Sequence, residues 1–259
     1  MRRLCYALAF ALVMLARTVS AQDDLSLMRL IRQTIDNNPR LRADRERNLE
    51  RHPICPPDLR AAANIAGADA HAWTVIGRCA LKQEDKKTAE DAFRRVLAIA
   101  PSAEGCSLLA IALVNESKLD DVPQLLREGA QLDPAEDQLF RAWGAYYRAR
   151  GDLRGAADSY HRAIAILYPD GLGLFEYDDD SATLGDIYRE LGDHRNAVRA
   201  YQDACFVYIC TAEPTTLNYG RELRALGRDD ELKLLIASIP RGQEHAADQL
   251  RIEAKKPNQ

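Results

Sequence analysis

The sequence has few aromatic residues, no long hydrophobic run beyond its first residues and no motif of a common catalytic site. Phe, Trp and Tyr make up 7% of the 259 residues, whereas hydrophobic residues as a whole make up 47%. That hydrophobic fraction is enough for a packed core and excludes a disordered chain. Sheets are rich in aromatic and β-branched residues, while the Ala, Leu and Arg that are abundant here favour helices. The composition therefore predicts an all-α fold.

Residues that could carry out chemistry are present but lie in no recognised arrangement. The five histidines are scattered, and none belongs to a His-Glu-x-x-His pattern. The sequence has no Gly-x-Ser-x-Gly elbow, no Cys-x-x-Cys pair and no glycine-rich phosphate loop. An acidic cluster near residues 176–180 lacks the spacing of a calcium loop. We therefore predict no catalytic residues, no metal site and no cofactor, and we expect that the chain is not an enzyme.

Residues 1–21 have the pattern of a cleaved export signal. Basic residues follow Met1, residues 4–16 are apolar, and small residues, Val19 and Ala21, occupy the two positions that a signal peptidase reads. The alternative is a membrane anchor, but a spanning helix needs about 20 apolar residues. We expect the mature chain to be periplasmic or secreted and to have no integral membrane anchor.

The mature chain is acidic and keeps five cysteines. Removal of Arg2, Arg3 and Arg17 with the signal changes the formal net charge from −4 to −7, which argues against general nucleic-acid binding. An exported chain meets an oxidising environment, so we expect one or two disulfides and one thiol left over or paired with another molecule. Alternatively, most of these cysteines are small buried apolar residues. The connectivity stays open among Cys55, Cys79, Cys106, Cys205 and Cys210.

One pattern of small and aromatic residues recurs along the chain. Counted from residue 70, positions 4, 8, 20, 24 and 32 hold Trp, Gly, Ala, Phe and Pro, and units that start at residues 137 and 178 repeat much of this pattern. The matching residues are Trp73, Gly77, Ala89, Phe93 and Pro101, then Phe140, Trp143, Gly144, Tyr147, Ala156, Tyr160 and Ala163, then Leu184, Gly185, Tyr188, Ala197, Tyr201 and Ala204. This pattern resembles the tetratricopeptide repeat, a helix–turn–helix unit of about 34 residues.

The resemblance implies a right-handed α-solenoid of helix hairpins. Gly at position 8 and Ala at position 20 let the two helices of a unit approach, and aromatic residues at positions 11 and 24 fill the space between units. Gly151 and Gly192, each followed by Asp, are expected to end first helices in a left-handed conformation, with the Asp capping the next helix. We divide the chain into the signal 1–21, an N-terminal helical cap 22–69, a solenoid 70–240 and a frayed tail 241–259, with units near 70–103, 103–136 (degenerate), 137–170, 178–211 and 213–240 (a cap).

The resemblance also implies a concave groove that holds peptides or extended protein segments. In this family the groove is lined by first-helix positions such as 5, 9 and 12, and here these positions hold six arginines and one acidic residue. The arginines are Arg78, Arg141, Arg148, Arg189, Arg221 and Arg224. Because Arg makes bidentate contacts with carboxylates, we expect a basic groove that accepts an acidic segment or a carboxylate terminus. Alternatively, these arginines are solvated or paired with Glu and Asp on adjacent helices.

The leading hypothesis is a non-enzymatic interaction scaffold or adaptor in the cell envelope or secretory space. The alternative is an accessory protein of polysaccharide export or surface adsorption, which would need exposed aromatic residues on the groove. The aromatic residues fall instead on packing or near-packing positions: Trp73, Trp143, Tyr147 and Tyr188. A third hypothesis is an enzyme with a site in the 168–180 loop or the 22–69 segment. No sequence motif supports it.

Overall fold

The computed structural model describes residues 55–56, 58–67, 69–167, 179–205, 212–239 and 242–254. Within these ranges the chain forms twelve helices and no strand, which confirms the all-α prediction. None of the described helices is long and apolar enough to cross a membrane. The predicted export signal, most of the predicted N-terminal cap and the loop between the third and fourth units lie outside the described residues.

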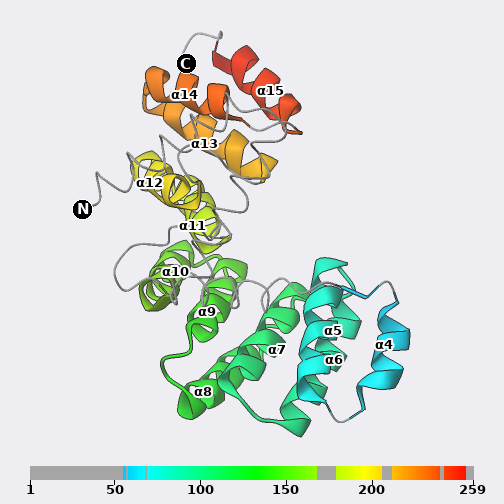
Figure 1. Cartoon of the computed structure of the whole chain (residues 1–259). Helices are drawn as coiled ribbons and strands as arrows, with labels where there is room; N and C mark the ends of the chain where they lie inside the picture. Colours follow the sequence, from blue (N-terminus) through cyan, green and yellow to red (C-terminus); the bar gives the residue numbers. More distant parts are fainter. Residues whose placement is uncertain are drawn as a thin grey trace, which may run out of the picture.

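The helices are arranged as consecutive hairpins, and each hairpin stacks on the next (Figure 1). We call the earlier member of each hairpin the first helix and the later member the second helix. After α4 (Leu59–Ala66), the pairs are α5 (Ala70–Lys82) with α6 (Lys86–Ile99), α7 (Ala103–Asn115) with α8 (Val122–Leu132), α9 (Asp137–Ala149) with α10 (Leu153–Leu167), α11 (Asp179–Glu190) with α12 (His194–Ala204), and α13 (Glu213–Ala225) with α14 (Asp229–Ser238), followed by α15 (Glu244–Ala254). The chain is therefore an α-solenoid of helical hairpins.

Glycine at position 8 lets the two helices of a hairpin touch. A Cβ added to this glycine would lie within 2.4 to 2.6 Å of the aromatic ring at position 24 of the same unit, closer than real Cβ contacts. The three pairs are Gly77 with Phe93, Gly144 with Tyr160, and Gly185 with Tyr201. The position-24 ring thus packs within its own unit, whereas we expected it to fill the space between units. A larger residue at position 8 would push the second helix away.

The turn inside each hairpin contains one residue with positive φ, always at position 15. The five residues are Glu84 (60°), Ser117 (61°), Gly151 (79°), Gly192 (73°) and Gly227 (66°). The Asp that follows in three units accepts a hydrogen bond from a backbone N–H in the first turn of the second helix, as expected of an N-cap. These caps are Asp85 with Thr88 N, Asp152 with Gly155 N, and Asp193 with Asn196 N.

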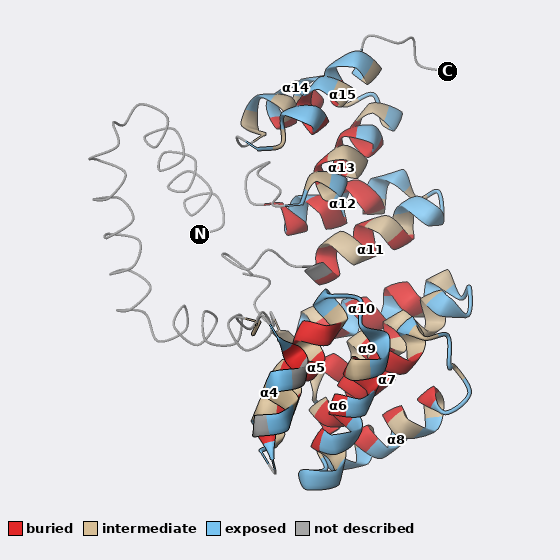
Figure 2. Ribbon diagram, turned by 90° about the vertical axis from the view of Figure 1, so that its right-hand side faces the viewer, coloured by how far each residue is buried: buried red, intermediate tan, exposed pale blue. Residues whose placement is uncertain are grey.

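The core runs along the whole stack of described helices. Figure 2 shows the buried residues on the sides where helices face one another, with exposed residues on the turns and outer faces. The largest side chains that are completely buried are the aromatic rings of Phe93, Tyr201 and Tyr219. Because each hairpin buries its apolar side only against its neighbours, the stack positions the first helices side by side along one surface.

A disulfide fastens the start of the described chain to the first hairpin. Cys55, which precedes α4, is bonded to Cys79 on α5, with the two Cα atoms 5.4 Å apart. Cys106 is a buried free thiol, and Cys205 is disulfide-bonded. The Trp73 indole also donates to the carbonyl of Gly67 at 2.9 Å. The expected pattern of one or two disulfides and one remaining thiol thus agrees with the structure.

The end of the chain differs from the prediction. Within the expected frayed tail 241–259, residues 244–254 form helix α15, whose Leu250 is 1% exposed. The position-8 glycine of the last hairpin, Gly220, faces Leu250 of α15, with 2.5 Å from its added Cβ to the leucine Cδ2. The prediction was wrong because Ala246, Ala247 and Leu250 lie on one face of a helix and give it a buried side. The 213–240 pair therefore does not end the array.

Candidate interaction surface

The six predicted arginines all lie on first helices. Positions 5, 9 and 12 are about one helical turn apart, so their side chains leave each helix on the same face. Arg78 is on α5, Arg141 and Arg148 are on α9, Arg189 is on α11, and Arg221 and Arg224 are on α13. The structure therefore brings them to one surface of the stack, which we call the first-helix face.

On α5, Arg78 pairs with the next first helix. Its Nη2 lies 2.8 Å from Oε1 of Glu104, which is in the first turn of α7. The Arg78 side chain is only 12% exposed and Glu104 is 45% exposed. The guanidinium is thus held in place by a carboxylate that still meets solvent.

On α9, both arginines pair with α11. Arg141 Nη2 lies 2.5 Å from Oδ2 of Asp180, a carboxylate with only 7% of its side chain exposed, and Arg141 Nε lies 3.4 Å from Asp137. At the other end of the helix, Arg148 forms an ion pair with Glu190. Two ion pairs therefore join α9 to α11, the first helices of two consecutive units.

The C-terminal units are joined by a similar set of polar contacts. Arg221 contacts Glu253 of α15, with 3.0 Å from Nη2 to Oε1 and 3.3 Å from Nε to Oε2. Asp186 on α11 accepts a hydrogen bond from the Asn218 amide at 2.9 Å and one from the Tyr201 hydroxyl at 2.6 Å. Burial, followed by this bond to Asp186, raises the pKa of Tyr201, so the phenol remains a hydrogen-bond donor.

The remaining two arginines are engaged as well. Arg189 lies 3.8 Å from Asp186 on its own helix, and Arg224 interacts with other groups of the chain. Four of the six arginines thus pair with a carboxylate on the following unit, which is the alternative raised above. Sequence reasoning missed these carboxylates because it considered only positions 5, 9 and 12. The partners occupy other positions: Glu104, Asp180, Glu190 and Glu253.

A pocket lies between α5 and α7 on this face. Its volume is about 280 Å³, and both members of the Arg78–Glu104 pair line it. The remaining lining residues are Ala70, His71, Thr74, Val75, Val96, Ala100, Ser102, Gly105 and Leu108. The pocket combines an apolar wall with one charge of each sign.

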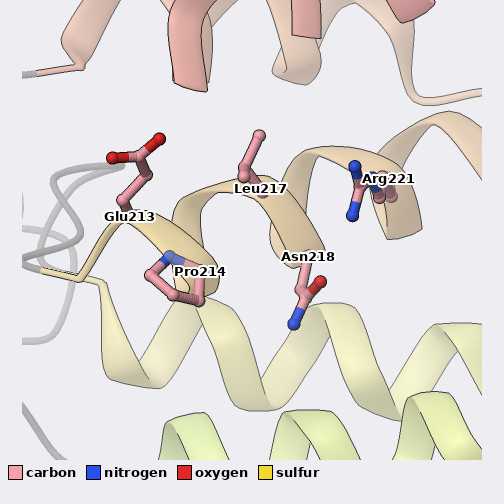
Figure 3. Close-up of a pocket in the computed structure, with 5 residues that line it drawn as sticks. All are labelled: Glu213, Pro214, Leu217, Asn218 and Arg221. Atoms are coloured by element: carbon pink, nitrogen blue, oxygen red, sulfur yellow. The ribbon is translucent and has the colours of Figure 1, made fainter. Parts of the chain in front are cut away.

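A second pocket of about 280 Å³ lies on α13, close to the other end of the stack. Figure 3 shows its lining residues along one helix, with Leu217 and Asn218 leaving it in different directions between Glu213 and Arg221. Its five lining residues, these four and Pro214, occupy positions 1, 2, 5, 6 and 9 of their unit. The α5 residues in the first pocket occupy the same five positions: Ala70, His71, Thr74, Val75 and Arg78. The repeat therefore produces an equivalent hollow at two distant places.

An α-solenoid whose hairpins expose a continuous face belongs to the class of repeat proteins that present extended surfaces to other macromolecules. Residues 70–102 and 182–205 match the family described as tetratricopeptide repeat. The two matched segments confirm the resemblance to this repeat that the recurring Gly and aromatic residues predicted. No curated protein matches the chain.

Solved structures with a similar arrangement have low sequence identity to this chain. A structure of pilF from Pseudomonas aeruginosa has a TM-score of 0.50 and 14% identity, and the match covers 73% of this chain and 92% of that one. BtubC from P. vanneervenii has a TM-score of 0.50 and 15% identity, with coverage of 78% and 90%. A MamA structure has 19% identity and a TM-score of 0.45, with coverage of 74% and 98%. At these identities, the similarity to pilF and BtubC shows the fold alone.

Proposed function

We propose that this chain is a non-enzymatic adaptor that holds a segment of another protein on its first-helix face, in the cell envelope or secretory space. Tetratricopeptide-repeat proteins are protein-interaction scaffolds. The observation that carries the proposal is the pair of equivalent pockets on this face, one on α5 and α7 and the other on α13. An extended segment that follows the stack would meet both.

The six arginines of the first-helix face differ in how readily they can contact this segment. Because four of them already pair with a carboxylate of the next unit, a ligand must either fit beside an existing pair or displace its carboxylate. An acidic segment requires displacement, and Asp180 is too buried to become solvated when it is displaced from Arg141. The other three pairs are more exposed, and two of them, Arg78–Glu104 and Arg221–Glu253, include residues that line the pockets, so these two are the proposed contact points.

The proposed compartment is supported by disulfide chemistry. Cys55 and Cys79 are bonded, and such bonds persist in oxidising compartments and are rare in the cytosol of most organisms. The export signal expected over residues 1–21 points to the same compartment.

The aromatic residues favour this function over polysaccharide binding. No aromatic side chain in the described part of the chain is exposed; each is buried or half-buried. Trp143, Tyr146 and Tyr147 pack on one another, with ring centroids 5.6 to 5.8 Å apart. These rings do not form the open stacking platform that a sugar chain would need.

Site-specific photo-crosslinking tests the proposal. A photoreactive amino acid replaces His71 or Pro214, two exposed residues at position 2 of pocket-bearing first helices. Matched controls place it at Asp91 or Asp158, two exposed residues at position 22 of second helices. In extracts of the native envelope or secretory fraction, we expect one protein to crosslink from both position-2 sites and from neither control site. Crosslinks of equal yield from all four sites, or from the controls alone, would contradict a ligand on the first-helix face.

A further inference from the structure

The α5–α7 pocket presents a hydrogen-bond donor and an acceptor side by side. Arg78 Nη2 contacts Glu104 Oε1, but Arg78 Nε is buried and makes no hydrogen bond with any described residue. Glu104 keeps nearly half of its side chain exposed. A ligand in this pocket therefore meets the exposed part of the Arg78 guanidinium and an accessible carboxylate within one ion pair.

Two other polar side chains of the pocket are already used by their own helices, whereas the third, His71, is exposed. The Thr74 hydroxyl donates to the Ala70 carbonyl at 3.0 Å, and the Ser102 Oγ accepts from Gly105 N at 3.0 Å. Val75, Val96 and Leu108 supply an apolar wall. The Arg78–Glu104 pair is thus the charged feature by which this pocket can discriminate between ligands, beside the exposed His71.

The pair is poorly matched to a ligand of either charge. A carboxylate near Arg78 would also approach Glu104, and an ammonium group near Glu104 would also approach Arg78, so each attraction is opposed by a repulsion. A carboxamide is neutral and has a carbonyl acceptor beside an N–H donor. It can accept from the Arg78 guanidinium and donate to the Glu104 carboxylate at the same time.

We propose that the α5–α7 pocket binds a carboxamide, the side chain of Asn or Gln in a segment of the partner protein, with Arg78 donating to the amide oxygen and Glu104 accepting from the amide nitrogen. This inference rests on the proposed function and names the chemistry of its ligand. The α13 pocket is less suited to this role. There, Arg221 already directs both Nε and Nη2 at Glu253, and Glu213 contacts His245 Nδ1 at 2.7 Å.

A display library of random 12-residue segments is the probe. It is selected against the oxidised native protein, against Glu104→Gln and against Glu128→Gln, which makes the same change on the exposed side of α8. We expect the native protein and Glu128→Gln to enrich Asn and Gln at one anchor position. Glu104→Gln leaves Arg78 unopposed, so the anchor should change to Asp or Glu.

The strongest native binder is then synthesised with its anchor Gln or Asn and with the matching Glu or Asp. Native protein should bind the acidic peptide about tenfold more weakly, and Glu104→Gln should reverse the order. Circular dichroism melting confirms that each variant is folded.

Three results would overturn the inference. Enrichment of Asp or Glu by the native protein would reject the carboxamide but leave the proposed function standing, with an acidic ligand. An Asn or Gln anchor that is unchanged in Glu104→Gln would place its recognition elsewhere. Enrichment of no segment by the native protein would remove both the inference and the proposed function.

Discussion

The ion pair between Arg141 and Asp180 provides the sharpest test of how the units are held together. The Asp180 side chain is 7% exposed and that of Arg141 is 18% exposed, so both charges are largely removed from water. Replacing Arg141 by Met keeps the length of the side chain but leaves a buried carboxylate without its cation. Breaking a buried pair in this way costs 3–5 kcal/mol, and the residual exposure of Arg141 places the expected loss near the lower limit, about 3 kcal/mol.

The assay is urea unfolding at pH 7, followed by circular dichroism, on a double-mutant cycle. Arg141→Met should lower the free energy of unfolding by about 3 kcal/mol, and Arg141→Met/Asp180→Asn should recover part of the loss because the more buried of the two carboxylates beside Arg141 is then neutral, while Asp137 keeps its charge. Lys233→Met is the control: its pair with Asp230 is 75% and 94% exposed, so no measurable change is expected. The reasoning is refuted if Arg141→Met loses less than about 1 kcal/mol, or if the double variant is as unstable as the single one.

Three further predictions concern the turns, the pH dependence and the disulfide. Glu84→Gly should raise the free energy of unfolding by about 0.5–1 kcal/mol in urea titrations, because φ is 60° at this residue and Gly has no Cβ to strain. The hydrogen bond from Lys118 lowers the pKa of Glu90, so the ionised carboxylate stabilises the fold above the ordinary pKa of 4.5, and this contribution is lost as the pH falls through the lowered value. Lys118→Met should therefore lower stability at pH 7 and flatten the acid limb of a stability–pH profile. Cys55→Ala/Cys79→Ala should lose about 3 kcal/mol in the same titrations, because the bond closes a loop with a sequence separation of 24.

Each of these predictions has a result that would contradict it. Gly151→Ala should act in the opposite direction to Glu84→Gly, so a gain in stability there would show that the left-handed turn carries no strain. An unchanged acid limb in Lys118→Met would mean that the pair with Glu90 is screened by water. A double cysteine variant as stable as the oxidised native protein would show that α4 and α5 stay docked without the bond.

The hairpins could be predicted because their signal is local. The glycine at position 8 and the aromatic residue at position 24 are 16 residues apart in every intact unit, as Gly77 and Phe93 are. The requirement for a small residue against a ring is therefore visible in the spacing alone. The positive φ at Gly151 and Gly192 was predicted for the same reason, since a helix stop next to a capping Asp can be read within a few residues.

The partners of the arginines could not be predicted from such spacings. Arg78 meets Glu104 at a separation of 26 residues, Arg221 meets Glu253 at 32, and Arg148 meets Glu190 at 42. These separations depend on how each unit rotates on the next, and on the additional residues between the units that begin at 137 and 178. Helix α15 was missed because its residues do not match the repeat pattern.

The disulfide at Cys55 has a consequence for how the stack comes apart. In a solenoid each unit is stabilised by its neighbours, so opening begins at an end, where one neighbour is missing. At the first hairpin, α5 is held covalently and by the cap α4, whereas at the other end α15 rests on α13 through packing and a few polar contacts. Local unfolding should therefore begin at one end of the array. Amide exchange should advance from α15 toward α5, and the α13 pocket should open and close many times while the α5–α7 pocket keeps its shape.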